Sequence, residues 1–155
     1  MLTQEQLLAM SSDDYMNQEQ REYFRALLLE MKNDIRLQIE QAKAELAKME
    51  YEADELDKAA QEEDRRLQLR FLDRQTKLLP KLDEALKRVD TDEFGYCDVT
   101  GEPIGVPRLL ARPTATLCAE EKIRQEAADE LAKKAALKKK RDLDAKKKDE
   151  RNAMI

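Results

Sequence analysis

Two cysteines, Cys97 and Cys118, are the residues of this 155-residue sequence whose type and spacing point most directly to chemistry. Each opens a pair of the form C-x-x-X, and Thr100 and Glu121 stand at the second positions of the two pairs. Four cysteines at this spacing would predict structural zinc, which takes four sulfur or nitrogen ligands. Because only two soft ligands remain, we expect zinc to be absent and no cofactor or metal ligand set to be present.

The two thiols leave two alternatives open. Cys97 and Cys118 are either buried small hydrophobic side chains or a redox-active pair of free thiols or reversible disulfide. The N-terminus shows no basic region followed by an apolar run, so no export signal is predicted. We therefore expect a reducing, cytoplasmic location, where a permanent disulfide is rare.

A second candidate site is the acidic stretch from residue 51 to residue 64, whose only basic residue is Lys58. Such a cluster could contact a metal ion or a basic pocket. Alternatively it is a solvated turn in which Asp54 or Asp57 caps the helix that follows.

A third candidate is a group of cations that could converge on a phosphate-bearing ligand, since Arg and Lys bind phosphate well. The alternative is that they are scattered surface charges. The members are Arg74, Lys77, Lys81, Arg108, Arg112 and Lys122. The chain has no His, no phosphate-binding glycine loop and no nucleophile motif, so we expect no enzyme activity.

Long helices must position these residues. Apolar residues recur at helical spacing along residues 17–92, interrupted only by a short polar stretch near residues 51–60. A short connection between two long helices forces them antiparallel. The sequence therefore predicts a mainly α fold built on an antiparallel coiled-coil hairpin, with its tip near 51–60.

The other segments flank this hairpin. Residues 1–16 are a lead with one or two helical turns, and residues 93–121 hold all the glycines and most of the prolines. We expect 93–121 to form a small zinc-knuckle-like globular unit and 122–137 a C-terminal helix. Residues 138–155 are expected to be a basic tail, either partly disordered or a fraying helix. A local apolar set should form a small core against the hairpin base: Phe94, Tyr96, Ile104, Val106, Leu109, Leu110 and Leu117.

Charge and hydropathy limit the kinds of partner that this protein is expected to bind. The net charge is −5, and 41% of the residues are charged. From Lys133 to Arg151 ten basic and four acidic residues give +6, which leaves −11 for the remainder. A mostly acidic body argues against nucleic acid as the main partner. No stretch of the sequence is long and apolar enough for a membrane span.

Taken together, the motifs resemble the DksA/TraR family of bacterial transcription factors that bind RNA polymerase. The tip reads "ADELDKAAQEED", with the pattern D-x-x-D-x-A, and the knuckle contains "FGYC", "GEPIGVPRL" and "ARPTATLC". The resemblance covers about residues 14–130.

This resemblance implies that a monomer inserts its coiled coil into the polymerase secondary channel and destabilises open complexes. It implies cooperation with the alarmone ppGpp in the stringent response, and no sequence-specific DNA binding or membrane contact. It assigns Asp54, Asp57 and Ala59 to the acting tip. It assigns the ppGpp site at the polymerase interface to Lys81, Arg112, Lys122 and Arg74.

The sequence also departs from the family pattern. Thr100 and Glu121 replace two of the four zinc cysteines, which resembles the cysteine-poor, zinc-independent branch of the family. Pro80 stands beside Lys81, within the basic set. A thiol-based redox sensor acting on the same polymerase, through Cys97 and Cys118, is the alternative function.

Overall fold

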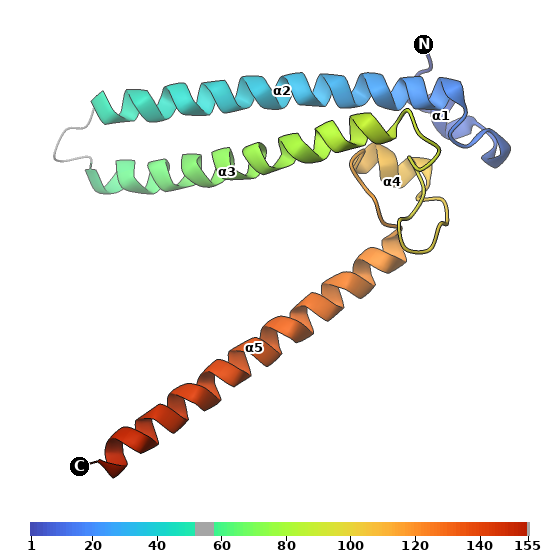
Figure 1. The fold of residues 1–155 in the computed structure, drawn as a ribbon. Helices are drawn as coiled ribbons and strands as arrows, with labels where there is room; N and C mark the ends of the chain where they lie inside the picture. Colours follow the sequence, from blue (N-terminus) through green and yellow to red (C-terminus); the bar gives the residue numbers. More distant parts are fainter. Residues whose placement is uncertain (52–57, 155) are drawn as a thin grey trace.

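The computed structural model describes residues 1–51 and 58–154. Two long helices, α2 and α3, lie side by side, with the C-terminal end of α2 and the N-terminal end of α3 at the same end of the pair, while α5 runs away from the opposite end, the hairpin base (Figure 1). The predicted antiparallel hairpin is confirmed. The elements are α1 (Gln4–Ala9), the 3-10 turn η1 (Ser12–Asp14), α2 (Gln18–Tyr51), α3 (Lys58–Arg88), α4 (Val106–Ala111) and α5 (Ala119–Ala153).

The hairpin core is concentrated at its base. Leu82 of α3 is fully buried, whereas Leu67, two-thirds of the way toward the tip, is 55% exposed. The seam predicted from apolar spacing therefore holds near the base and loosens toward the tip. α3 continues through Pro80 without interruption. On α2 the buried apolar residues are Phe24, Leu28, Ile35, Ile39 and Ala42.

Ion pairs also join the two long helices near the base. Lys32 pairs with Asp83, and its ammonium donates a hydrogen bond that lowers the pKa of the Asp83 carboxyl. Arg21 reaches Asp92, in the turn after α3, with 3.1 Å between Nη2 and Oδ1. These pairs are partly exposed, so each adds little stability by itself.

The glycine- and proline-rich unit packs directly on the hairpin base, as predicted. Phe94 lies against Phe24 of α2, with 5.8 Å between the ring centroids. Ile104 and Leu109 are buried in the same cluster, and Tyr96, Val106 and Leu110 pack against it. Leu117 stays partly exposed and is not part of that cluster.

The N-terminal segment completes this core, which the sequence analysis did not predict. A Thr3–Gln6 capping box opens α1, and Leu7 of that helix is buried. The hydroxyl of Tyr15 donates to the carbonyl of Gly95 and accepts from the N–H of Gly105, at 3.0 Å. Burial raises the pKa of this hydroxyl. The first 16 residues thus pack against the unit that follows α3 and hydrogen-bond to it.

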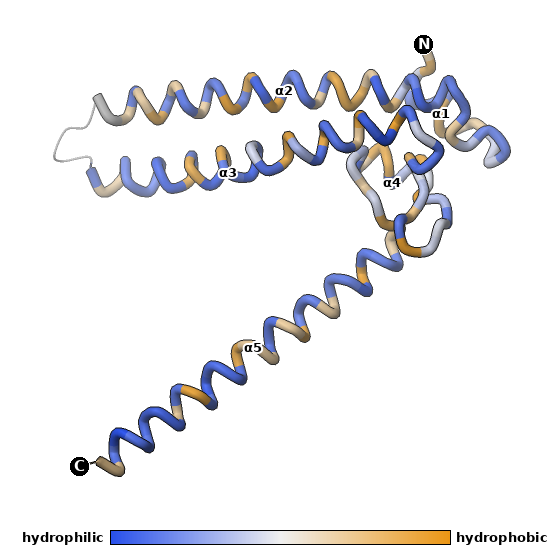
Figure 2. The backbone as a smooth tube through the Cα atoms, viewed as in Figure 1, coloured by the Kyte–Doolittle hydropathy of each residue, from blue (hydrophilic) through white to orange (hydrophobic). Residues whose placement is uncertain are grey.

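α5 is longer than expected. The predicted helix ends at residue 137, with 138–155 a partly disordered tail or a fraying helix, but α5 continues as a regular helix to Ala153. The physical reason is composition: residues 119–153 contain no Gly or Pro and are rich in the strong helix formers Ala, Lys, Glu, Arg and Leu. Figure 2 shows α5 as mostly hydrophilic, with short hydrophobic stretches scattered along its length. None of the described helices is long and apolar enough to cross a membrane.

Gly95 has the least room for a side chain of the three glycines, which gives a prediction. Its φ is +87°, and a Cβ there would lie 2.7 Å from Cγ of Met16. Gly101 has a similar φ of +72° but no neighbour within 4 Å of a built Cβ. Gly95→Ala should therefore lower the free energy of unfolding by about 2–4 kcal/mol, and Gly101→Ala by only about 1 kcal/mol.

Urea unfolding followed by near-ultraviolet tyrosine signals measures this difference, because the far-ultraviolet helical signal includes the 35 residues of α5, most of which lie outside the core. Equal losses for the two variants would contradict the proposed close packing of Met16 on Gly95.

Candidate functional site

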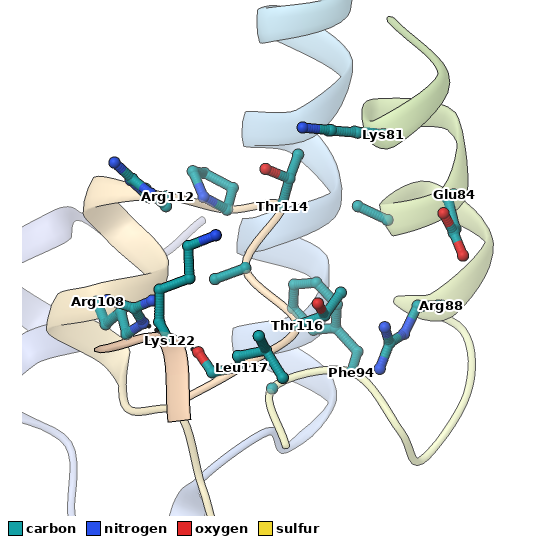
Figure 3. A pocket seen from close by; sticks show the side chains of 14 residues that line it. Lys81, Glu84, Arg88, Phe94, Arg108, Arg112, Thr114, Thr116, Leu117 and Lys122 are labelled. Atoms are coloured by element: carbon teal, nitrogen blue, oxygen red, sulfur yellow. Dashed lines mark hydrogen bonds between the residues drawn. The ribbon is translucent and has the colours of Figure 1, made fainter. Parts of the chain in front are cut away.

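A pocket of about 300 Å3 lies where the hairpin base, the knuckle-like unit and α5 meet. Figure 3 shows side chains from α3, α4, the 112–117 loop and the start of α5 around it. The lining includes five cationic side chains but only one carboxylate, that of Glu84. The cations are Lys81, Arg88, Arg108, Arg112 and Lys122.

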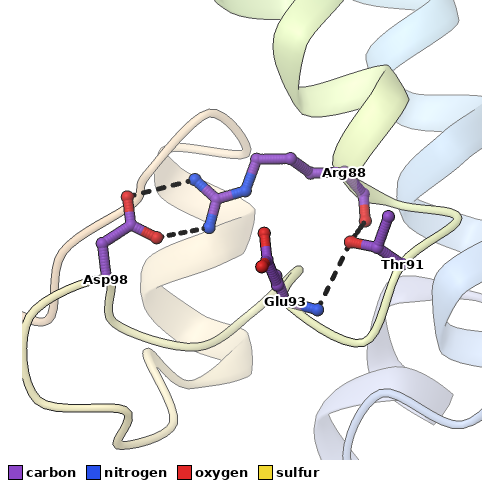
Figure 4. Close-up of polar contacts among 4 residues, drawn as sticks. All are labelled: Arg88, Thr91, Glu93 and Asp98. Atoms are coloured by element: carbon purple, nitrogen blue, oxygen red, sulfur yellow. Dashed lines mark hydrogen bonds and ion pairs between the residues drawn. The ribbon is translucent and has the colours of Figure 1, made fainter.

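Two of the five cations are held by the fold. Arg88 donates two hydrogen bonds to Asp98, at 2.6 and 3.3 Å, and its side chain is mostly buried (Figure 4). Arg108 donates from Nε to the carbonyl of Leu117 at 3.0 Å. Both arginines therefore have fixed positions and bring positive charge to the pocket wall.

The other three cations are available to a ligand. Among the described residues, the side chains of Lys81 and Arg112 make no hydrogen bond or ion pair. Lys122 lies 4.0 Å from Glu126, at the limit of an ion pair. An anion entering the pocket would gain these charges without first breaking strong internal pairs.

This pocket brings together three of the four cations that the family resemblance assigned to one site. Lys81, Arg112 and Lys122 line it, but Arg74 does not and lies exposed on α3, seven residues before Lys81. The sequence analysis grouped Arg108 with these cations and missed Arg88 altogether. The spacing along α3 could have identified Arg88, because it follows Lys81 by seven residues and residues seven apart on a helix share a face.

The chemistry available in the pocket is anion binding. Thr114 and Thr116 add hydroxyl groups to the cationic wall. The volume is at the lower end of the range for small-molecule sites. The composition fits a phosphate-bearing small molecule, for which planar guanidinium groups and ammonium groups are the usual partners.

A separate polar cluster surrounds the thiol of Cys97. The Thr100 hydroxyl and the backbone N–H groups of Cys118, Thr100 and Val99 donate toward its sulfur, and together they lower its pKa to about 6. Cys97 is 3% exposed, and both cysteines are free thiols. Thr100 thus stabilises a thiolate from the position where the zinc pattern has a cysteine.

Of the three residues expected to act at the tip, the structure describes Ala59 alone. Asp54 and Asp57 fall outside the described residues. Ala59 is exposed in the first turn of α3.

Two family models match this chain in succession. Residues 20–89 match the model described as the N-terminal domain of DnaK suppressor protein DksA. Residues 92–127 match the model described as the prokaryotic dksA/traR C4-type zinc finger.

Individual proteins match over most of the chain as well. The RNA polymerase-binding transcription factor DksA of Caulobacter vibrioides is 47% identical over 115 residues, covering 74% of this chain and 81% of that protein. Its Escherichia coli K12 counterpart is 42% identical over 110 residues, covering 68% and 71%. The structure of transcription factor DksA2 from Pseudomonas aeruginosa is 49% identical, with a TM-score of 0.73, covering 82% of this chain and 98% of that one.

The expectation that zinc and other cofactors are absent is wrong in the light of these matches. Residues 92–127 match a C4-type zinc-finger model, which points to zinc binding. The donor set present here is smaller than four cysteines: Glu121 is buried and lies 3.4 Å from Arg124. No group of three or more His, Cys, Asp or Glu side chains that could hold a metal ion occurs among the described residues. These residues therefore do not fit a four-ligand zinc ion.

The hydrogen bond from Thr100 to Cys97 gives a second prediction. In a Cys118→Ser background freed of metal by a chelator, Thr100→Val should raise the Cys97 thiol pKa by about one to two units, because a charged acceptor loses one hydrogen bond. Ultraviolet absorbance of the thiolate measures this pKa. Thr114→Val, which removes a hydroxyl elsewhere in the unit, is the control and should leave the pKa near 6.

The sign of the linked stability follows from the lowered pKa. Thiolate formation stabilises the fold fully above the ordinary thiol pKa, and this contribution is lost as the pH falls through about 6. A wild-type thiol pKa close to 9, or one that Thr100→Val does not change, would contradict this account.

Proposed function

Because the chain belongs to the DksA family of transcription factors, we propose that it regulates transcription by binding RNA polymerase. The main support for this proposal is that the hairpin and the unit at its base match relatives described as RNA polymerase-binding transcription factors. That likeness extends to 98% of a solved relative. The regulator acts without catalysing a reaction of its own.

In this proposal the coiled-coil hairpin enters the secondary channel of the polymerase and the tip acts near the active site. Asp57 is the acting residue, supported by Asp54 and Ala59. The 31 residues of α3 span about 47 Å at 1.5 Å per residue, so the hairpin is a long, narrow projection from the base. Contact by the tip destabilises promoter open complexes.

The cationic pocket would serve as this protein's half of a ppGpp site at the polymerase interface. The alarmone carries two diphosphate groups, and the pocket offers Lys81, Arg112 and Lys122 as cations that no strong internal pair occupies. Arg88 and Arg108 add fixed positive charge behind them. Arg74, on the exposed surface of α3, would contact the polymerase or the outer part of the ligand.

The remaining expectations from the sequence stay predictions within this proposal. The protein acts as a monomer in the cytoplasm, during the stringent response, without sequence-specific DNA binding and without contacting a membrane.

A thiol-based redox sensor that acts on the same polymerase is the second candidate. The lowered pKa of Cys97 favours it, because the thiolate is the form that oxidants attack. The Thr100→Val titration decides whether that thiolate exists. An ordinary thiol pKa in the wild type would remove this candidate without affecting the first.

The pocket gives a prediction with a matched control on the same helix. Lys81 lines the pocket, whereas Lys77, one turn earlier, is an exposed lysine that pairs with Asp73 on the surface. Lys81→Ala should reduce the ppGpp-dependent part of repression at a ribosomal RNA promoter about tenfold, equivalent to about 1.4 kcal/mol. Lys77→Ala should leave it within about twofold.

Transcription in vitro with purified polymerase, with and without ppGpp, measures both variants beside the wild type. Repression without ppGpp should be unchanged in both. If Lys81→Ala responds to ppGpp like wild type, the pocket is not the alarmone site. If the wild type does not bind polymerase at all, the family function itself fails.

A further inference from the structure

The distal part of α5 has a surface that the proposed function does not use. α5 contains 35 residues, about 52 Å of helix, and every residue from Ile123 to Met154 is exposed. Figure 1 shows α5 leaving the base of the hairpin with no other element beside its distal half. The zinc-finger family match ends at residue 127, so this distal half lies beyond it.

Positive charge is gathered on one face of this distal half. At about 100° per residue, six cations fall within a band about 120° wide and about 27 Å long. The band contains a single carboxylate, Asp144, while Asp142 and Asp149 lie on the opposite face. We call this band the basic stripe; its members are Lys133, Lys140, Arg141, Lys147, Lys148 and Arg151.

The charges of the basic stripe are not neutralised by the protein. Among the described residues, none of its six side chains makes an ion pair or hydrogen bond. Every one of them is exposed. A polyanion lying along the helix could therefore contact all six without displacing an internal partner.

We propose that the basic stripe of α5 binds the phosphate backbone of double-stranded DNA without reading its sequence. Duplex DNA carries one negative charge for about every 1.7 Å of its axis, so a straight stripe of about 27 Å meets many phosphates at once. All six residues of the basic stripe are lysines or arginines, and they are spread along this length of the helix. This interaction is independent of polymerase binding and of the cationic pocket.

Other polyanions fit the stripe less well. α5 contains no aromatic residue, so it lacks the stacking platforms with which proteins hold single-stranded nucleic acid. A membrane surface requires a sustained apolar face beside the cations. The distal half offers only Leu137, which lies within the stripe itself, and Leu143, well away from it.

A matched pair of variants tests the proposal in the full-length protein. The stripe variant changes four stripe lysines to glutamine, and the control variant changes four lysines outside the stripe. Both therefore have the same net charge, and glutamine preserves helix propensity, which circular dichroism verifies. The stripe variant is Lys133→Gln, Lys140→Gln, Lys147→Gln and Lys148→Gln; the control is Lys134→Gln, Lys138→Gln, Lys139→Gln and Lys146→Gln.

Fluorescence anisotropy with a labelled duplex of arbitrary sequence is the measurement, repeated from about 50 to about 200 mM salt. We expect the wild type to bind in the micromolar range or weaker, with a slope of log K against log salt of about −5 for six phosphate contacts. The stripe variant should bind at least about tenfold more weakly, with the slope reduced by about 3 to 4. The control variant should lose far less affinity, and its salt slope should change far less.

Three results would overturn the proposal: no binding by the wild type at low salt, equal losses in the two variants, or a slope near zero. Tighter binding to poly-glutamate than to duplex would assign the stripe to an acidic protein surface instead. Tighter binding to phosphatidylserine vesicles would assign it to a membrane.

Discussion

One shared core at the base of the hairpin determines the rest of this structure. Phe24 from α2, Leu82 from α3 and Phe94 from the following loop are buried in a single cluster, together with Leu109 of α4. The unit spanning residues 93–118 is too small to bury such side chains by itself, and below about 40 residues a chain rarely folds unaided. Packing on the hairpin supplies the missing apolar surface, and Tyr15 ties the N-terminal segment to the same place.

The shared core at the hairpin base also forms the cationic pocket. Its walls come from α3, α4, the 112–117 loop and the first turn of α5, which meet only because the core brings them together. Arg88 and Arg108 are fixed by partners within the knuckle-like unit, Asp98 and the Leu117 carbonyl. Lys58, at the first position of α3, lies about 45 Å along the helix from Arg88, and the proposed acting residue Asp57 directly precedes Lys58 in the sequence. The proposed regulator thus separates ligand binding at one end of a rod from action at the other.

The sequence predicted the parts of this arrangement that depend on local pattern. Helical spacing located the hairpin, and the apolar residues around Phe94 were expected to pack on its base. The packing of Tyr15 on Gly95 could not be predicted, because it joins residues 80 positions apart through one hydroxyl. The extent of α5 was missed for a different reason: absence of an apolar stripe was taken to end the helix, although intrinsic propensity alone favours its continuation. The inference from missing cysteines to absent zinc was contradicted by the family match.

The central claim is that the tip acts on the polymerase at a distance from the surfaces that hold the protein there. Transcription in vitro from a ribosomal RNA promoter tests this claim with the variant Asp57→Asn. The control is Asp64→Asn, which removes the charge of an exposed aspartate on α3. Competition binding verifies that both variants occupy polymerase equally. The account predicts that Asp57→Asn represses about tenfold more weakly than wild type, a difference of about 1.4 kcal/mol, while Asp64→Asn represses normally. Full repression by Asp57→Asn at equal occupancy would contradict it.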